Sequence, residues 1–182
     1  MRECRQSPDE TIWQHGLHVA EHYARIRDHL DHGASLDGWR IPEWLSDPRI
    51  AAGQLDRATM AEYLLYHDCG KPLCRTVDEQ GRQHFPDHAR ISAEAYLAAG
   101  GSQEIAHLIR SDMDIHLLKA EQVPEFATRP EALSLLLAGL AEIHSNARMF
   151  GGIESTSFKI KWKHLDKAGR RILNQMSQKG QS

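Results

Sequence analysis

The chain has 182 residues, 41% of them hydrophobic, and a formal net charge of -3 at pH 7. This length and apolar content suit one well-filled core and are small for two ordinary domains, so we expect a single domain over residues 1–182. The slight negative charge argues against a surface built for bulk nucleic-acid binding, and the absence of a long apolar run or signal segment predicts a cytoplasmic protein with no membrane partner.

The first helix is predicted to run from an N-cap at Ser7 to about Leu30. Pro8 suits the first turn, and Glu10 completes a capping box with Ser7. One stripe of the helix contains Ile12, His15, Val19 and Ile26. Because these residues recur at three-, four- and seven-residue steps, His15 is expected to point inward. A lone inward histidine is more often a core residue than a metal ligand. Because further candidate ligands follow in the sequence, we favour the ligand role for His15.

Residues 31–55 are rich in glycine and proline, which predicts a loop with one or two short helical turns. Trp39 and Trp44 are expected to anchor this loop on the core.

The central stretch is the apolar helical run that follows Asp56, its predicted N-cap, and ends in His67 and Asp68. Gly70 and Pro72 are expected to end this helix, because glycine accepts left-handed angles and proline cannot continue the hydrogen-bond ladder. An imidazole nitrogen beside a carboxylate oxygen suits a divalent cation such as Mn, Ni, Co, Fe or Zn or, less readily, Mg. Lys71 adds a positive charge that would meet a phosphate near the metal.

Residues 73–77 and 83–85 flank a turn-rich centre, which predicts a small β-hairpin containing His84. The next helix is expected from about His88 to Ala98. His88, Ile91 and Ala95 recur at helical spacing, so we expect His88 to point toward the same interior as the central pair.

Ser102 is predicted to cap a helix that extends to about Leu118, with Asp112 on its inner face and His116 continuing that face. After a connector at residues 121–130, a run that is apolar almost all round predicts a buried central helix. Glu142 lies in this helix, where a carboxylate is costly unless it is paired or bound to metal. Either role remains open. His144 is an alternative ligand, but it lies some 200° further around the helix.

The C-terminal segment at about residues 155–178 carries six basic residues and one acidic residue. The basic residues are Lys159, Lys161, Lys163, Lys167, Arg170 and Arg171. Contact with phosphates of a nucleotide or RNA is one interpretation. A helix docked on the core through Phe158, Trp162 and Leu165 is the favoured one.

His15, the His67-Asp68 pair, and the segment from Arg75 to His88 together resemble the HD superfamily of metal-dependent phosphohydrolases. The resemblance spans about residues 11–150. It is nearest to the HD domain of some bacterial tRNA nucleotidyltransferases and to RNA-repair relatives. It implies an all-α fold, a single-domain helical bundle with a core at about residues 7–150 and a basic C-terminal extension.

The resemblance also implies a set of ligands for a divalent metal. The predicted metal ligands are His15, His67, Asp68 and Glu142, with Glu142 standing where the superfamily normally has its last Asp. The predicted catalytic residues are Asp68, Lys71 and His88. The predicted substrate-binding residues are Lys71, His84, His88, Asp112 and Lys159. Relatives often carry a histidine where Asp112 stands, so a second metal held in the usual way is not expected.

The predicted function is metal-assisted hydrolysis of a phosphate ester on a nucleotide or an RNA end. The resemblance favours a 2′,3′-cyclic phosphate or a 2′-phosphate as substrate. A nucleoside 5′-monophosphatase is the nearest enzymatic alternative. A non-catalytic nucleotide- or RNA-binding module that kept the HD fold is the alternative from another class, supported by the missing late Asp. The sequence predicts no oligomeric state.

Overall fold

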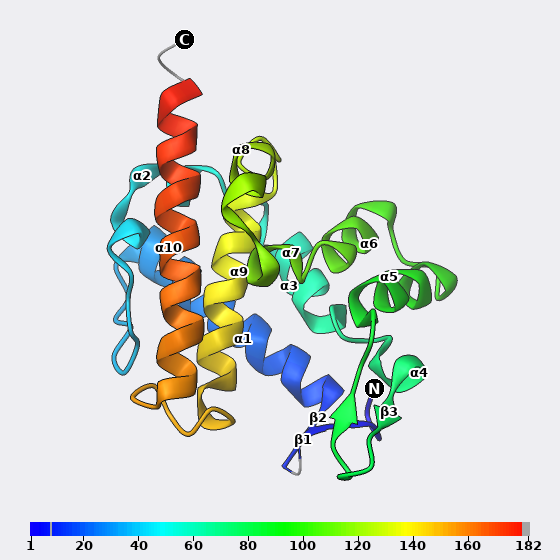
Figure 1. Ribbon diagram of the computed structural model, residues 1–182. Helices are drawn as coiled ribbons and strands as arrows, with labels where there is room; N and C mark the ends of the chain where they lie inside the picture. The colour runs from blue at the N-terminus through cyan, green and yellow to red at the C-terminus, as the bar shows by residue number, and fades with distance from the viewer. Residues whose placement is uncertain (8, 180–182) are drawn as a thin grey trace.

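The computed structural model describes residues 1–7 and 9–179, in which α-helices form a bundle and two short antiparallel strand pairs lie at one end (Figure 1). The predicted all-α class is therefore confirmed. The helices are α1 (Ile12–His32), α2 (Pro48–Ala52), α3 (Arg57–Tyr66), α4 (Lys71–Cys74), α5 (His88–Ala98), α6 (Gln103–Arg110), α7 (Asp114–Leu117), α8 (Val123–Phe126), α9 (Ala132–Ser145) and α10 (Thr156–Lys179). The strands are β1 (Arg5–Ser7), β2 (Glu10–Thr11), β3 (Thr76–Val77) and β4 (Gln83–His84).

Helix α1 begins later than the sequence predicted. Its N-cap is Thr11, whose hydroxyl accepts a hydrogen bond from the backbone N–H of Gln14, while the Gln14 side chain accepts one from the Thr11 N–H. The predicted Ser7 cap is wrong, because Ser7 ends β1 and pairs with Glu10 of β2. Pro8, which was expected in the first helical turn, lies outside the described residues. Two adjacent capping boxes, Ser7 to Glu10 and Thr11 to Gln14, are available here, and the strand pairing leaves the later one to cap the helix.

Helix α9 is the centre of the bundle, as its apolar sequence predicted. It packs between α1 and α10, and every residue from Ala132 to Ala141 is buried (Figure 1). Helix α1 also packs against α3, so it connects the central helix with the helix that precedes His67 and Asp68.

Two glycines allow the backbones around this pair to approach closely. A Cβ atom on Gly16 of α1 would lie 2.4 Å from the carbonyl oxygen of Leu65. A Cβ atom on Gly70 would lie 2.4 Å from the backbone nitrogen of Ser92 on α5. Gly70 has φ -85°, so the expectation that it supplies a left-handed angle is wrong. The absence of a side chain at Gly70 instead allows the backbone of α5 to approach.

Asp56 caps α3 as predicted, because its side chain accepts hydrogen bonds from two backbone N–H groups.

The loop at residues 33–55 contains a 3₁₀ turn, Glu43–Ser46, and the short α2. The predicted anchors are confirmed, since Trp44 is buried and Trp39 is partly buried against the core. Trp39 stacks on His144 with the ring centroids 4.1 Å apart, and the His144 ring also meets Phe158. His144 therefore packs among aromatic rings, which agrees with the prediction that it lies on a different face from Glu142.

The β3–β4 hairpin and α5 have nearly the predicted bounds. The buried face of α5 is one residue out of the predicted register, because it consists of Ala89, Ser92, Ala93 and Tyr96. His88 is only partly buried. The helix expected from Ser102 to Leu118 is broken, since α6 ends at Arg110 and a turn precedes α7. Within that turn, Asp112 accepts a hydrogen bond from the Tyr63 hydroxyl.

The basic C-terminal segment forms α10, which is docked on the core through Phe158 and Leu165. This is the favoured interpretation of the sequence. No helix within residues 1–7 and 9–179 has both the length and the apolar character needed to cross a membrane.

We predict that Gly16→Ala lowers the free energy of unfolding by about 2–3 kcal/mol, because its methyl group overlaps the Leu65 carbonyl and forces α1 away from α3. Urea denaturation measures this change. The control is Leu17→Ala at the next position, where the side chain is 38% exposed and the change should stay within about 0.5 kcal/mol. Equal effects of the two substitutions would contradict the role of Gly16.

We predict that His144 makes the folded state sensitive to acid. Burial lowers the pKa of His144 to about 4, and the charges of His22 and Arg25 act in the same direction. As the pH falls, His144 is therefore protonated in the unfolded chain at a higher pH than in the folded protein. The stability that depends on neutral His144 is present above about pH 6.5 and is lost as the pH falls toward 4, by up to about 3 kcal/mol.

Urea unfolding of His144→Gln between pH 7 and 4 tests this prediction. The variant should be less stable than the wild type at pH 7 and should lose less stability on acidification. The exposed His164→Gln is the matched control and should keep the wild-type pH dependence. If His144→Gln kept it too, the prediction would be wrong.

Candidate metal centre

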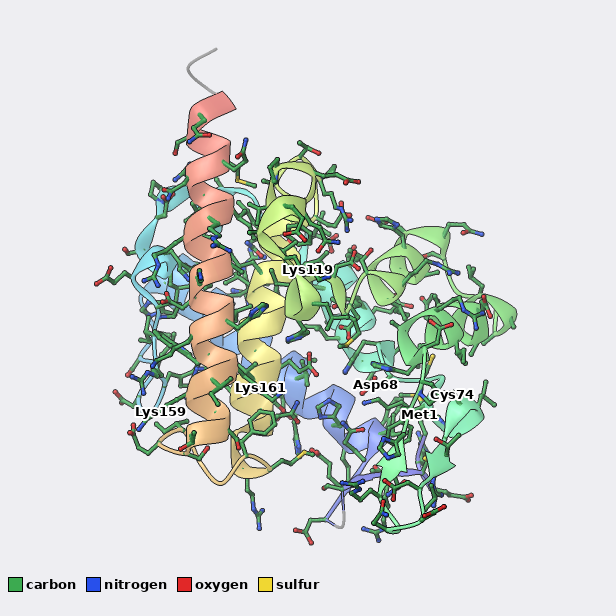
Figure 2. The ribbon with its side chains drawn as sticks, in the orientation of Figure 1. Met1, Asp68, Cys74, Lys119, Lys159 and Lys161 are labelled. Atoms are coloured by element: carbon green, nitrogen blue, oxygen red, sulfur yellow. The ribbon has the colours of Figure 1, made fainter. Side chains whose placement is uncertain are left out.

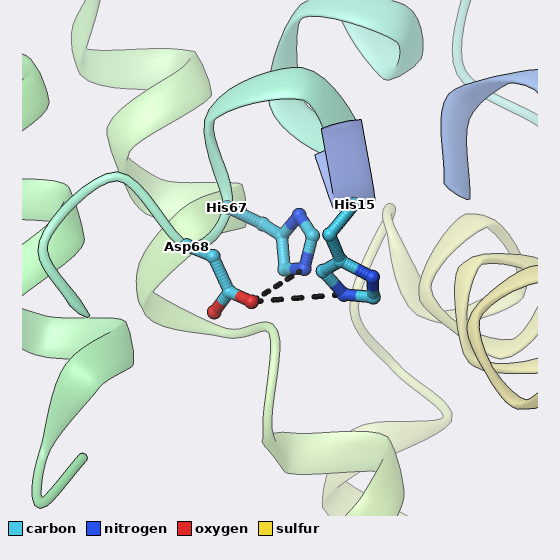
Figure 3. Close-up of side chains that lie close together, drawn as sticks. All are labelled: His15, His67 and Asp68. Atoms are coloured by element: carbon cyan, nitrogen blue, oxygen red, sulfur yellow. Dashed lines mark ion pairs between the residues drawn. The ribbon is translucent and has the colours of Figure 1, made fainter. Parts of the chain in front are cut away.

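Three side chains from two distant segments of the sequence lie close together. His15 comes from α1, and His67 and Asp68 come from the turn that follows α3 (Figure 3). One ligand atom from each lies within 4.8 Å of the other two. The Asp68 Oδ2 atom is 3.3 Å from His67 Nε2 and 3.7 Å from His15 Nε2. The close contact of α1 with α3 at Gly16 allows this arrangement.

Hydrogen bonding leaves several of these atoms without a protein partner. His67 Nδ1 donates to the Leu64 carbonyl at 2.7 Å, which directs the free Nε2 toward Asp68. The atoms buried without a hydrogen bond include His67 Nε2, Asp68 Oδ1 and both ring nitrogens of His15. Such unsatisfied buried groups are rare in proteins, and a cation between the rings and the carboxylate would bind the Nε2 atom of each histidine. Two imidazoles and a carboxylate therefore fit a divalent metal such as Mn, Fe, Co, Ni or Zn.

The charges at this site are strongly coupled. Burial raises the pKa of Asp68, but the positive charges of His67 and Lys71 outweigh burial and hold the pKa well below its usual range. Burial lowers the pKa of His67, but Asp68 and Asp112 outweigh it and raise the pKa to about 10. In the metal-free protein the proton on His67 compensates the Asp68 charge. A metal must displace that proton, so metal affinity should fall as the pH is lowered.

Lys71, which was predicted to be a catalytic and substrate-binding residue, lies beside Asp68. It is buried, and its Nζ donates to Asp68 Oδ2 at 2.5 Å and to Gln6 Oε1 at 3.0 Å. The same Nζ lies over the ring of Phe85. The ammonium group therefore holds the carboxylate in place, and its contact with a phosphate stays a prediction.

The two histidines of the hairpin segment differ in position. His88 Nδ1 donates to the Phe85 carbonyl at 3.1 Å, which leaves Nε2 3.7 Å from Asp68 Oδ1. His84 is exposed and donates to Asp78 within the hairpin. The structure thus brings His88 to the centre and does not bring His84 to the three ligands.

Asp112 and Glu142 flank the centre, and both charges act to raise the pKa of His67. Asp112 is buried, which raises its pKa, and it accepts a hydrogen bond of 2.6 Å from the Tyr63 hydroxyl. Glu142 accepts a hydrogen bond of 2.7 Å from His116 Nε2. Burial raises the Glu142 pKa, but the His116 charge outweighs it and lowers the pKa. Glu142 lies outside the three-residue ligand group, so its role as a metal ligand stays a prediction.

Lys159 was predicted to bind substrate. Its Nζ forms an ion pair with Glu154 at 2.7 Å. Figure 2 shows Lys159 near the start of α10, on the other side of the molecule from Asp68. The structure therefore does not bring Lys159 to the metal ligands.

Glu10 is a residue of the site that the sequence analysis assigned to a helix cap. Its Oε2 lies 3.7 Å from His15 Nδ1, and its Oε1 accepts a hydrogen bond of 2.5 Å from His18 Nδ1. The interaction with His15 is the main reason that the pKa of Glu10 is lowered. Thr11 and Gln14 also form a capping-box pattern in the sequence. If that pattern had been chosen as the helix start, Glu10 would not have been assigned to a cap. A carboxylate behind a metal-binding histidine orients the ring and increases its basicity.

Comparison with known families matches residues 12–146 to the HD domain. The matched range starts at the first residue of α1 and includes the three ligands and Glu142. No curated protein and no solved structure matches the chain. The nearer likeness to tRNA nucleotidyltransferases therefore stays a prediction.

We predict that Glu10→Gln weakens binding of Mn²⁺ or Co²⁺ by roughly tenfold, because His15 loses the carboxylate behind its Nδ1. Titration calorimetry on protein first stripped with chelator measures the affinity. Asp9→Asn removes a charge from the neighbouring, exposed position and serves as the control. A similar loss in both variants would mean that Glu10 acts only through its general negative charge.

Proposed function

Because the chain belongs to the HD domain family, whose members are in general metal-dependent phosphohydrolases, we propose that it hydrolyses a phosphate ester on a nucleotide or an RNA end. The favoured esters are a 2′,3′-cyclic phosphate and a 2′-phosphate. The observation that carries the proposal is the buried group of His15, His67 and Asp68, in which the unpartnered Nε2 atoms of both histidines face Asp68 Oδ2.

The residues of this group would hold the metal, with Glu142 proposed as a further ligand. When bound, a divalent metal polarises a phosphoryl oxygen and lowers the pKa of coordinated water. Asp68 is held by Lys71, so the carboxylate keeps its position and its charge. The same ammonium group supplies a positive charge for the phosphate.

His88 is the proposed proton donor and substrate contact for the hydrolysis. Within residues 1–7 and 9–179 its Nε2 has no hydrogen-bond acceptor at close range, and it lies 3.7 Å from Asp68 Oδ1, which supports a role in binding a substrate oxygen or in transferring a proton to the leaving group. The burial of the three ligands strengthens these electrostatic interactions, because little water competes with them.

A non-catalytic binding module is the competing proposal, and one observation favours it. Glu142 is already paired with His116, so the position of the late superfamily Asp is filled by a carboxylate with another partner. Metal analysis of protein purified without chelator separates the two classes, because the binding module would have lost its metal.

We predict that Asp68→Asn reduces the bound metal from about one ion per chain to nearly none and abolishes hydrolysis. Removing the carboxylate charge leaves two imidazoles beside a lysine, a poor site for a cation. Elemental analysis and circular dichroism check metal content and fold. The exposed Asp37→Asn is the control and should retain both metal and activity. Wild-type metal content in Asp68→Asn would rule out the site.

A panel of substrates tests the choice of ester. Nucleoside 2′,3′-cyclic phosphates, 2′-phosphates and 5′-monophosphates are each assayed with Mn²⁺, Ni²⁺, Co²⁺ and Mg²⁺. We expect the first two classes to be hydrolysed faster. Preference for the third class would identify a 5′-monophosphatase. No bound metal and no hydrolysis of any ester would favour the binding module.

A further inference from the structure

A cavity of about 420 Å³ lies beside the metal centre and is formed by three separate segments. The β1–β2 hairpin contributes Glu10, α1 contributes His18, and the end of α9 with its following turn contributes Ser145, Arg148 and Met149. The volume is in the range of small-ligand sites, roughly 300–1,000 Å³. No role in the chemistry described above involves Arg148, Ser145 or Met149.

The cavity lies about one helical turn from the metal centre on both helices that flank it. His18 follows His15 by three residues on α1, and Ser145 follows Glu142 by three residues on α9, so each pair occupies neighbouring positions on one helix face. Glu10 contacts His15 with one carboxylate oxygen and His18 with the other. Glu10 therefore lies in the wall of the cavity and also next to the candidate ligand His15.

Two polar groups of the cavity lack partners among the described residues. The exposed guanidinium of Arg148 forms no hydrogen bond or ion pair in that part of the chain. The hydroxyl oxygen of Ser145 is buried and makes no hydrogen bond. An arginine presents a planar fork of donors that suits a phosphate, and a buried hydroxyl without a partner needs an explanation such as a bound ligand.

The remaining groups suit the other parts of a nucleotide. Met149 is 49% exposed and offers an adaptable apolar surface for a base or a sugar. The Oε1 atom of Glu10 is engaged by the Nδ1 atom of His18 at 2.5 Å. Asp9 is exposed at the edge of the cavity. The charge available for a phosphate inside the cavity is therefore that of Arg148.

We propose that this cavity binds the nucleotide next to the reacting phosphate, with the adjoining phosphodiester on Arg148 and an oxygen of that nucleotide on Ser145. This inference rests on the proposed function and narrows its substrate to an RNA end of at least two nucleotides. A mononucleotide fills only the metal centre, whereas a dinucleotide also reaches Arg148.

The test compares a mononucleotide with a dinucleotide that carries the same end. The mononucleotide is adenosine 2′,3′-cyclic phosphate. The dinucleotide is two adenosines joined by a 3′→5′ phosphodiester and ending in a 2′,3′-cyclic phosphate. Dissociation constants are measured by calorimetry with chelator present, so that no hydrolysis occurs, and kcat/KM is measured with Mn²⁺. Arg148→Ala should raise the Kd of the dinucleotide about tenfold and that of the mononucleotide less than twofold.

The matched control is Arg110→Ala, which removes another exposed arginine, from α6, and should change neither Kd. Ser145→Ala should produce a smaller loss that is also confined to the dinucleotide. Circular dichroism confirms that each variant is folded. An unchanged dinucleotide Kd in Arg148→Ala would overturn the inference. An equal loss for both probes would also overturn it, because Arg148 would then act on the reacting phosphate.

Failure of this inference is distinguishable from failure of the proposed function. If neither probe is hydrolysed with any metal but the Arg148-dependent difference in Kd persists, the subsite stands and the hydrolase proposal fails. If both probes are hydrolysed and Arg148→Ala affects them alike, the hydrolase proposal stands and the subsite fails.

Discussion

The buried carboxylate of Asp68 is the group on which the rest of the site depends. It is 1% exposed, and a charge without a partner in such a place would cost several kcal/mol. Three positive or potentially positive groups surround it, on His15, His67 and Lys71, and His88 lies close by. These residues come from α1, α4, α5 and the turn after α3. The packing of four chain segments is therefore coupled to one charge, and a bound cation would strengthen that coupling.

Close contacts between backbones set the distances between the candidate ligands. Gly16 brings α1 onto the carbonyl of Leu65, and Gly70 brings the turn after Asp68 onto α5. A side chain at either position would separate the helices by enough to move His15 or His88 away from Asp68. Because metal ligands must lie within a few tenths of an ångström of their ideal positions, these two glycines are as important for the site as the ligands are.

The N-terminal hairpin precedes the residues matched to the HD domain, yet it contributes to the centre. Gln6 accepts a hydrogen bond from Lys71, and Glu10 lies behind His15. Glu10 also forms part of the wall of the cavity that contains Arg148. Glu10 therefore lies between the cavity and the His15 ring that would hold the metal. This shared residue provides a physical connection between the neighbouring nucleotide and the orientation of the metal ligand.

The sequence by itself determined the features that depend on local periodicity and side-chain chemistry: the inward direction of His15, the adjacent candidate ligands His67 and Asp68, and the burial of α9. Where two local patterns fitted the sequence equally well, the sequence did not decide between them. The cap at Thr11 prevailed over the predicted cap at Ser7 because β1 pairs with β2. The pairing of Glu142 with His116, the placement of Glu10 behind His15 and the distance of Lys159 from the centre emerged only with the tertiary structure. Such pairings join residues from separate elements, so they depend on how helices cross and how closely their backbones approach, which no local pattern encodes.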